Sequence, residues 1–462
     1  MRHRDIEIAT LVIRFSWNRA FWSVAFLVSI LAMAGRAAES AHDRGIRSAP
    51  VKMGEIMPNL TSAEKSLTRN GRDAFVRISS VKGDETIKES EVGLGPTFNL
   101  DSCAGCHAYP TPGGSSPGQN PQIDVASREG ATNTVPRFVS KDGPVLQARR
   151  RRKTDGARDG SVVPLFSITG RRDANTCQMP QLILSEKESN LSFRIPTPLY
   201  GIGLIEAIPD SEIRANQSAH LSEKQKLGIS GHPNQNPVDG TITRLGWKAQ
   251  TQTIEVFTAE AYLIEQGVTN EMFQQERYEP PLSCMLNSTP EDHKILTGRR
   301  PEELYSNVSQ ISHFLRFLAP PEPAAETPAI IAGKHVFEEI GCGLCHTPIL
   351  KTGRSSHPIL GEKEVSLYSD LLVHRMGRRL ADDIVQGTAG PDEFRTAPLW
   401  GLGNRIFFLH DGRTRDLAEA IEFHSDIAQR RKGSAEPDRV IFNYRKLPPA
   451  SKQDLLDFLR SL

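Results

Sequence analysis

Two copies of one short cysteine pattern constrain what this chain can fold into more than any other feature. The segments CAGCH (103–107) and CGLCH (342–346) each hold two cysteines separated by two residues, with a histidine directly after the second cysteine. They account for four of the six cysteines in a chain of 462 residues. Such a segment fits half of a zinc site, a redox-active dithiol or the attachment point of a c-type haem.

The haem interpretation explains every position of the pattern. Zinc ribbons need no histidine after each pair, and their halves lie roughly 15–20 residues apart, whereas these segments lie in different halves of the chain. A thioredoxin-like dithiol needs one copy and no histidine. In a c-type site both thiols bond the porphyrin, and the histidine is the proximal ligand of the iron. We therefore predict two covalently attached haem c groups. The binding residues are Cys103, Cys106 and His107, and Cys342, Cys345 and His346.

The N-terminus has the features of an export signal. Four arginines precede an apolar run at 20–34, which is shorter than the ~20 residues of a membrane span. The run ends in Ala-Met-Ala, a pattern typical of signal cleavage. We expect a signal peptide over 1–34, a periplasmic protein and no stable membrane insertion after cleavage; an uncleaved anchor is the alternative.

Charge and the remaining cysteines give weaker indications. The net charge of +1 does not favour a nucleic-acid partner. The basic run at 149–153 is interpreted as a solvated loop rather than a docking patch. In an oxidising compartment Cys177 and Cys284 can form a disulfide worth roughly 4–5 kcal/mol; two buried thiols are the alternative.

The surroundings of the two motifs indicate an internal repeat. Phe98 and Phe337 each lie five residues before the first cysteine, with Gly95 and Gly333 further upstream. Downstream, RIPTPLYGIG resembles RTAPLWGLG, and GWKAQTQTI can be laid over LHDGRTRDL. The matched ranges are 194–203 with 395–403, and 246–254 with 409–417. The repeat predicts a mainly α fold of two cytochrome c-type haem domains.

The two units differ in length, because the first carries loop-rich insertions containing Gly, Pro and Ser. Helical spacing of apolar residues predicts helices in 366–384, 415–425 and 451–462. The predicted divisions are a signal peptide (1–34), an N-terminal extension (35–70), an N-terminal haem domain with insertions (71–318), a Pro/Ala-rich linker (319–329) and a C-terminal cytochrome c domain (330–462).

Several blocks of residues together resemble a known family. They include GLGPTFNLDSCAGCH, RIPTPLYGIGLIEAIPD, GCGLCHTP, FRTAPLWGLG and FLHDGRTRDLAEAIEFH, and the resemblance extends over about 71–462. The family is that of di-haem oxidoreductases described as peroxidases or thiol oxidoreductases. It is similar to bacterial di-haem cytochrome c peroxidases and to the methylamine-utilisation di-haem enzyme. The resemblance implies that a small periplasmic cytochrome or cupredoxin delivers electrons to the C-terminal haem, and that the N-terminal haem reduces hydrogen peroxide.

The resemblance also implies a second iron ligand for the C-terminal haem. In the relatives a His-Asp-Gly motif precedes this ligand by fourteen residues, and the motif at His410 leads at that spacing to His424. Ligation of one iron by His346 and His424 is therefore expected. A core histidine without iron is the alternative, and His374 and Met376 are competing ligands.

The overlay of the two units implies different surroundings for the N-terminal haem. Trp247 stands over His410 and is a candidate electron relay, a core tryptophan being the alternative. Ala261 stands over His424, so the N-terminal iron is expected to be open or ligated from elsewhere, with His220 and His232 as weak candidates. Whether calcium bridges the domains, as in similar enzymes, is left open.

Reduction of peroxide needs a group that moves a proton between the two oxygen atoms. The relatives use a glutamate assisted by a glutamine, but Phe257 stands at the glutamine position. The candidate carboxylates are Glu260, Glu265 and Glu206, each with a solvated helix face as the alternative. A non-catalytic electron carrier is the competing function, and a thiol oxidoreductase that uses Cys177 and Cys284 is the third.

Overall fold

The computed structural model describes residues 40–47, 52–82, 93–294, 305–426 and 435–462. The predicted signal peptide lies outside them. Within the described part of the chain, no helix is both long and apolar enough to cross a membrane.

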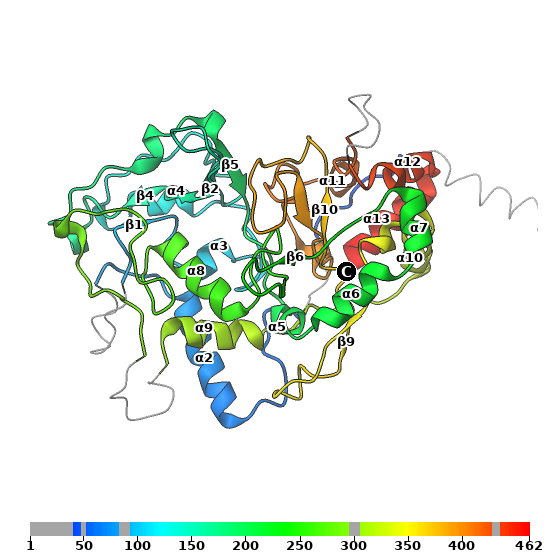
Figure 1. Cartoon of the computed structure of the whole chain (residues 1–462), viewed down its shortest axis with the longest axis horizontal. Helices are drawn as coiled ribbons and strands as arrows, with labels where there is room; N and C mark the ends of the chain where they lie inside the picture. The colour runs from blue at the N-terminus through cyan, green and yellow to red at the C-terminus, as the bar shows by residue number, and fades with distance from the viewer. Residues whose placement is uncertain (1–39, 48–51, 83–92, 295–304, 427–434) are drawn as a thin grey trace, which may run out of the picture.

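The elements form two lobes that lie side by side (Figure 1). Helices predominate and the strands are short, as expected for a mainly α fold. The N-terminal lobe contains α2 (Ser62–Val76), β1 (Thr97–Phe98), α3 (Cys103–Cys106), α4 (Gln122–Val125), β2 (Gln147–Arg150), β3 (Val162–Val163), β4 (Phe166–Ser167), β5 (Leu191–Arg194), α5 (Ile202–Glu206), α8 (Ile254–Gln266) and α9 (Asn307–Arg316). The other lobe contains α6 (Asp210–Ser218), α7 (Leu221–Leu227), α10 (Pro328–Ile340), β8 (Leu350–Lys351), β9 (Glu364–Val365), β10 (Val373–Arg375), β11 (Glu393–Arg395), α11 (Leu417–Glu422), α12 (Asp438–Lys446) and α13 (Pro449–Ser461). The short hairpin of β6 (Asn234–Gln235) and β7 (Ile242–Thr243) lies between the lobes.

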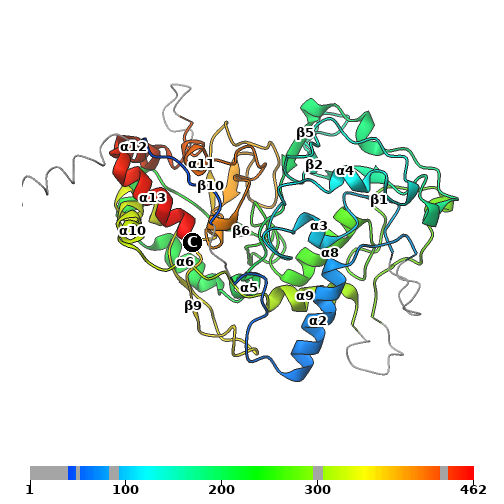
Figure 2. The ribbon, with the colours of Figure 1, turned by 180° about the vertical axis from the view of Figure 1, so that it is seen from behind.

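Each lobe contains an equivalent close helix pair, and a glycine permits the approach. In the N-terminal lobe a Cβ atom at Gly71 of α2 would lie 1.9 Å from the carbonyl oxygen of Gln310 in α9. In the C-terminal lobe a Cβ atom at Gly333 of α10 would lie 1.9 Å from the carbonyl oxygen of Asp454 in α13. Both views show α10 beside α13 and α2 beside α9 (Figures 1 and 2). These pairs are equivalent parts of one structural repeat.

A phenylalanine four residues after each glycine packs on the motif histidine. The ring centroid of Phe75 lies 6.2 Å from that of His107, and the centroid of Phe337 lies 6.4 Å from that of His346. The predicted match of Phe98 with Phe337 is therefore wrong: Phe98 lies in β1, which pairs with β4. The chain between the helix and the motif differs in length: residues 77–102 separate α2 from CAGCH, whereas α10 ends directly before CGLCH.

The overlay of 246–254 on 409–417 is confirmed by the backbone. Leu245 forms an antiparallel bridge with Thr251, and the equivalent Phe408 forms the same bridge with Thr414. Each bridge closes a tight loop before a helix, α8 in the first unit and α11 in the second. The loops hold Trp247 and His410 at equivalent positions.

Two segments cross the predicted divisions of the chain. In the N-terminal extension Asp43 accepts hydrogen bonds from Arg460 and from the Leu417 backbone, each at 2.8 Å. Asn216 of α6 donates to Thr347, directly after the CGLCH motif, at 3.1 Å. Residues 40–47 and α6–α7 thus pack on the C-terminal lobe, while α2 crosses the division predicted between residues 70 and 71.

Three secondary-structure predictions had different outcomes. The helices expected in 415–425 and 451–462 are present as α11 and α13. The helix predicted over 366–384 is wrong, because this segment contains β10, which pairs antiparallel with β11. Tyr368 and Leu371 have φ angles of 53° and 59°, which a right-handed helix cannot contain.

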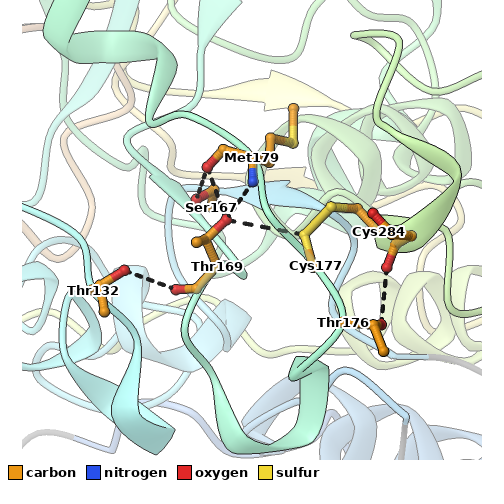
Figure 3. The surroundings of a disulfide bond; sticks show 8 residues. Thr132, Ser167, Thr169, Thr176, Cys177, Met179 and Cys284 are labelled. Carbon is orange, nitrogen blue, oxygen red and sulfur yellow. Dashed lines mark hydrogen bonds between the residues drawn. A yellow bond between two sulfur atoms is a disulfide. The ribbon is translucent and has the colours of Figure 1, made fainter.

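The disulfide between Cys177 and Cys284 is present, as predicted (Figure 3). Both cysteines are buried, and they join segments separated by 107 residues in sequence. Neighbouring polar groups hold the segment, since the Met179 N–H donates to the Thr169 hydroxyl at 2.8 Å. The bond lies in the core of the N-terminal lobe and lines neither of the cavities described below.

Candidate functional site

The CGLCH motif lines a large cavity in the C-terminal lobe, named here the C-terminal cavity. It offers about 1470 Å³ of space free of protein atoms, part of it open to solvent. The cavity brings together the predicted Cys342, Cys345, His346 and His424. Its apolar walls include Phe337, Leu399, Phe408, Leu417, Val440, Leu455 and Leu459.

His346 and His424, two of the four histidines that line this cavity, carry their proton on the same ring nitrogen. Nδ1 of His346 donates to the Tyr368 carbonyl at 3.0 Å, and Nδ1 of His424 donates to the Ala420 carbonyl at 2.9 Å. Because a carbonyl only accepts, each Nε2 keeps the lone pair that an iron ligand needs. Burial, and then the proximity of His424, lowers the pKa of His346 to about 4, so this ring is neutral. The pair has the properties of two ligands for one iron.

The competing histidine does not have a free nitrogen. Nδ1 of His374 pairs with Glu436 at 2.8 Å, and its Nε2 pairs with Asp370 at 2.9 Å. Met376 lines the C-terminal cavity. In the described part of the chain, the one close group of three side chains able to hold a metal ion is Cys345, Asp370 and His374. Its histidine is already bonded twice, so this group is not a calcium site, and calcium stays a prediction.

The CAGCH motif lines a second cavity, the N-terminal cavity, with about 1140 Å³ of space that is partly open. Nδ1 of His107 donates to the Gly114 carbonyl at 3.1 Å, the backbone of Thr197 also interacts with the ring, and burial lowers the pKa of this imidazole to about 4. Cys103 and Cys106 line the same space. The motif histidine is therefore prepared in the same way in both lobes.

The two cavities differ at one equivalent position. Thr253 caps α8 eight residues before Ala261, and Asp416 caps α11 eight residues before His424. Ala261 lines the N-terminal cavity, whose described lining holds neither a second histidine nor a methionine. His220 and His232 lie outside this lining, and His232 pairs with Glu393 at 3.2 Å.

Two of the three candidate carboxylates reach the N-terminal cavity. Glu260 and Glu265 line it, as does Phe257. Glu206 does not: it pairs with Arg316 at 2.9 Å and accepts the Ile254 N–H at 2.8 Å, at the start of α8. Glu206 therefore joins helices outside the cavity lining and is not brought together with the other two candidates.

The cavity also contains a hydrogen-bonded network that sequence reasoning missed. Glu265 accepts from Asn99 at 2.8 Å and from Gln147, whose Oε1 accepts from Arg149 Nε at 2.6 Å. Burial, and then the charge of Arg194, lowers the pKa of Arg149 to about 9. The basic run is therefore not a solvated loop at Arg149, which lies in β2 and faces the cavity. Gln147 and Arg149 are two residues apart, which places them on the same face of a strand; this spacing was the sequence signal that could have indicated the network.

Glu260 contrasts with Glu265, although both lie on α8. No hydrogen bond to the Glu260 carboxylate is present within the described ranges, and the side chain is half-buried at the cavity. A carboxylate without a hydrogen bond can accept or release a proton without breaking an existing bond, and Glu260 interacts with the charges of Arg149 and Arg277 only through space. Glu260 is therefore the better placed of the two for proton transfer.

Trp247 lines both cavities. Its indole N–H donates to the Ile195 carbonyl at 2.8 Å, and its ring lies edge-on to His410 with 6.5 Å between centroids. The backbones of the lobes exchange equivalent bonds here: Ile195 N–H donates to the His410 carbonyl at 2.7 Å, and Arg395 N–H to the Trp247 carbonyl at 2.8 Å. The predicted relay residue thus lies between the two candidate haem sites.

Two arginines of the C-terminal cavity, buried Arg395 and half-buried Arg405, fit a haem. Arg395 and Arg405 line the cavity, their Nε atoms have no hydrogen-bond partner, and neither forms an ion pair with the side chains that the structure describes. Burial lowers the pKa of each to about 10. Their terminal nitrogens donate to backbone carbonyls, Arg395 to Arg244 and Arg405 to Pro398, but a charge removed from water without an anion is unfavourable, and the propionate carboxylates of a haem would supply that anion. The residues present therefore fit the predicted group.

Comparison with known proteins gives one family and several distant structures. The family model described as "Di-haem oxidoreductase, putative peroxidase" matches residues 150–462. No curated protein matches the chain.

Three solved structures illustrate the distant similarity. Hydrazine synthase of Kuenenia stuttgartiensis is 12% identical, with 92% of this chain and 99% of that chain covered and a TM-score of 0.38. The diheme peroxidase BthA of Burkholderia thailandensis is 14% identical, with 92% of each chain covered and a TM-score of 0.36. A MauG-like protein associated with microbial copper homeostasis is 17% identical, with 58% and 90% covered and a TM-score of 0.31.

Proposed function

Because this chain belongs to the di-haem oxidoreductase family, we propose that it is a periplasmic di-haem peroxidase with two covalently attached haem c groups. The observation that carries the proposal is the difference between the cavities. The C-terminal cavity offers His346 and His424 as two iron ligands, whereas the N-terminal cavity offers His107 and has Ala261 in place of the second. The N-terminal site is thus the one where a peroxide can bind.

The N-terminal haem, when bound, supplies an iron that binds hydrogen peroxide and delivers the electrons for its reduction to water. The protein must move a proton from the inner to the outer oxygen atom of the peroxide. We assign this transfer to Glu260, because it lines the cavity and its carboxylate has no hydrogen bond within the described ranges. Glu265 accepts hydrogen bonds from Asn99 and Gln147, so its carboxylate is held in place and is assigned no proton transfer.

Arg149 has a second role in this proposal. Its buried guanidinium faces the cavity and is linked to Glu265 through Gln147. A fixed positive group in a site of low dielectric stabilises negative charge that develops on a leaving oxygen. Arg149 therefore favours cleavage of the bond between the two oxygens, while Glu260 controls the proton.

Electrons are proposed to arrive at the C-terminal haem from a small periplasmic cytochrome or cupredoxin. The side chains of Trp247 and His410 lie between the cavities and support a path across the interface. The predicted signal peptide and the disulfide support the periplasmic location, since disulfides persist in oxidising compartments.

The proposal is tested by peroxide reduction with an artificial electron donor. Glu260→Gln keeps the size of the side chain but removes the titratable proton, so we expect kcat to fall about 10²–10⁴-fold. Glu255→Gln is the matched control: Glu255 lies on the same helix, accepts from Ser309 at 3.1 Å and does not line the cavity. If the wild-type protein with both haems bound reduces no peroxide, it is an electron carrier and the proposal is overturned.

A further inference from the structure

Lys248, the residue after the candidate relay, is completely buried at the interface of the lobes. Its Nζ donates to the carbonyls of Gly390 at 2.8 Å and Glu393 at 2.7 Å, and lies 3.1 Å from Asp382 Oδ1. The ammonium comes from the loop of the first unit, and all three acceptors belong to 382–393 of the second. Its three protons are thus all used to join the two units.

The oxygen atoms around this ammonium form a site suited to a cation. Two carbonyls and one carboxylate are ligands that hard metal ions prefer. Asp382 is itself buried and also accepts from Arg194 Nε at 3.0 Å. Arg194 lines the N-terminal cavity. The cluster of Arg194, Asp382 and Lys248 therefore connects this cation site to the proposed peroxide site.

The same ammonium contacts the aromatic side chains between the cavities. Its Nζ lies 4.1 Å from the ring centroid of Phe394, which stacks on His410 with 4.3 Å between centroids. His410 in turn lies edge-on to Trp247. The backbone of Lys248 is also held in place, because its carbonyl accepts a hydrogen bond from the Asn234 side chain at 2.8 Å. Lys248 thus contacts the proposed electron path through its ammonium and through its backbone.

We propose that Lys248 is a positioning residue for electron transfer between the haems: its buried ammonium is a built-in cation that clamps the loop carrying Trp247 onto the C-terminal lobe, so that this transfer requires no bound metal ion. The inference rests on the electron path of the proposed function. One electron leaves the reduced C-terminal haem and is taken up by the oxidised N-terminal haem, without other reactants.

The test is the rate of electron transfer between the haems after a single-electron reduction pulse, in the full protein with both haems bound. Lys248→Met keeps the length of the side chain and removes the charge, while Asp382 keeps its bond to Arg194. We expect transfer to slow about tenfold or more, because small displacements between reacting groups have large effects on rate. The low-spin spectrum of the C-terminal haem should stay unchanged, which a general loss of structure would not allow.

A matched control removes another buried lysine of similar environment. Lys224 is 6% exposed and donates to the Asn216 carbonyl at 2.7 Å, but it lines neither cavity. Lys224→Met should keep the wild-type transfer rate. An equal slowing in both variants would show a general effect of removing a buried charge, and would contradict the proposal.

A metal chelator provides a measurement that does not depend on folding of a variant. Wild-type protein treated with EGTA should keep its transfer rate. Loss of transfer in EGTA with recovery on adding calcium, or an unchanged rate in Lys248→Met, would overturn the inference about Lys248 and leave the peroxidase proposal standing. Absence of any transfer between the haems in the wild-type protein would overturn the electron path and Lys248 with it.

Discussion

The two cavities are built from one structural repeat but differ in what they offer an iron. Each has a close helix pair, a phenylalanine on the motif histidine and an Nδ1–H held by a backbone carbonyl. At equivalent positions, however, the second unit has His424 and the first has Ala261. One changed side chain thus leaves two histidines with equivalent backbone contacts in one cavity and a single motif histidine in the other, while the supporting structure is kept.

Ala261→His is expected to have the largest effect, because it removes the difference between the cavities. An imidazole at this position would ligate the N-terminal iron as His424 is proposed to ligate the other. Peroxide reduction should fall by about 10³-fold or more, since binding of the substrate would be blocked. Steady-state peroxide consumption measures the loss. Full activity in a variant whose spectrum shows two low-spin haems would refute the proposed open site.

Trp247→Phe sharpens the comparison at the interface between the lobes. The phenyl ring keeps an aromatic contact with His410 but loses the hydrogen bond to Ile195. We expect electron transfer between the haems to slow about tenfold, with smaller changes in the spectra of either haem. Pulse reduction followed by absorption at the two haem bands measures the rate. A rate equal to that of the wild type would mean that Trp247 is a core residue only.

The buried Lys248 predicts a pH dependence of stability. Burial, partly offset by Asp382 and increased by Arg194, lowers its pKa from 10.5 to about 8. Between these values the unfolded chain binds more protons than the folded one, so the unfolding free energy rises with pH. The unfolding free energy of the wild type should therefore rise by roughly 3 kcal/mol more than that of Lys248→Met between pH 8 and 10.5, at 1.36 kcal/mol per pKa unit. Denaturant unfolding of both proteins at these two pH values measures it, and parallel pH profiles would contradict the assignment.

The disulfide should affect stability without affecting the reaction. Replacing Cys177 and Cys284 together by serine removes a cross-link over 107 residues and is expected to cost roughly 4–5 kcal/mol of unfolding free energy. Peroxide reduction at 25 °C should stay within about twofold of the wild type, because the pair lines neither cavity. Activity lost in a folded double variant would favour the thiol oxidoreductase hypothesis.

The sequence alone indicated the two motifs, His424 at its distance from His410, Trp247 and the Cys177–Cys284 pair. The motifs are short local patterns, His424 and Trp247 follow from the resemblance and the overlay of the two units, and the cysteine pair, 107 residues apart, follows from the cysteine count in a chain expected to be exported.

The parts that could not be predicted depend on distant contacts. Arg149 was interpreted as solvated because its neighbours are basic. In the structure β2 pairs with β5, and the Arg149 side chain is buried. Gly71 was missed because residues 77–102 separate its helix from the motif. Nothing local indicates that the ammonium of Lys248 meets carbonyls more than one hundred residues away. Tertiary packing determines these environments.

The central claim, that one iron has two histidine ligands and the other is open, is tested most directly by the electron paramagnetic resonance spectrum of the protein with both haems bound, oxidised and half-reduced. The account predicts one low-spin signal that His424→Ala converts to high spin, together with a high-spin signal from the N-terminal haem that persists in this variant. Two low-spin signals in the wild type that stay low-spin on half-reduction would contradict it.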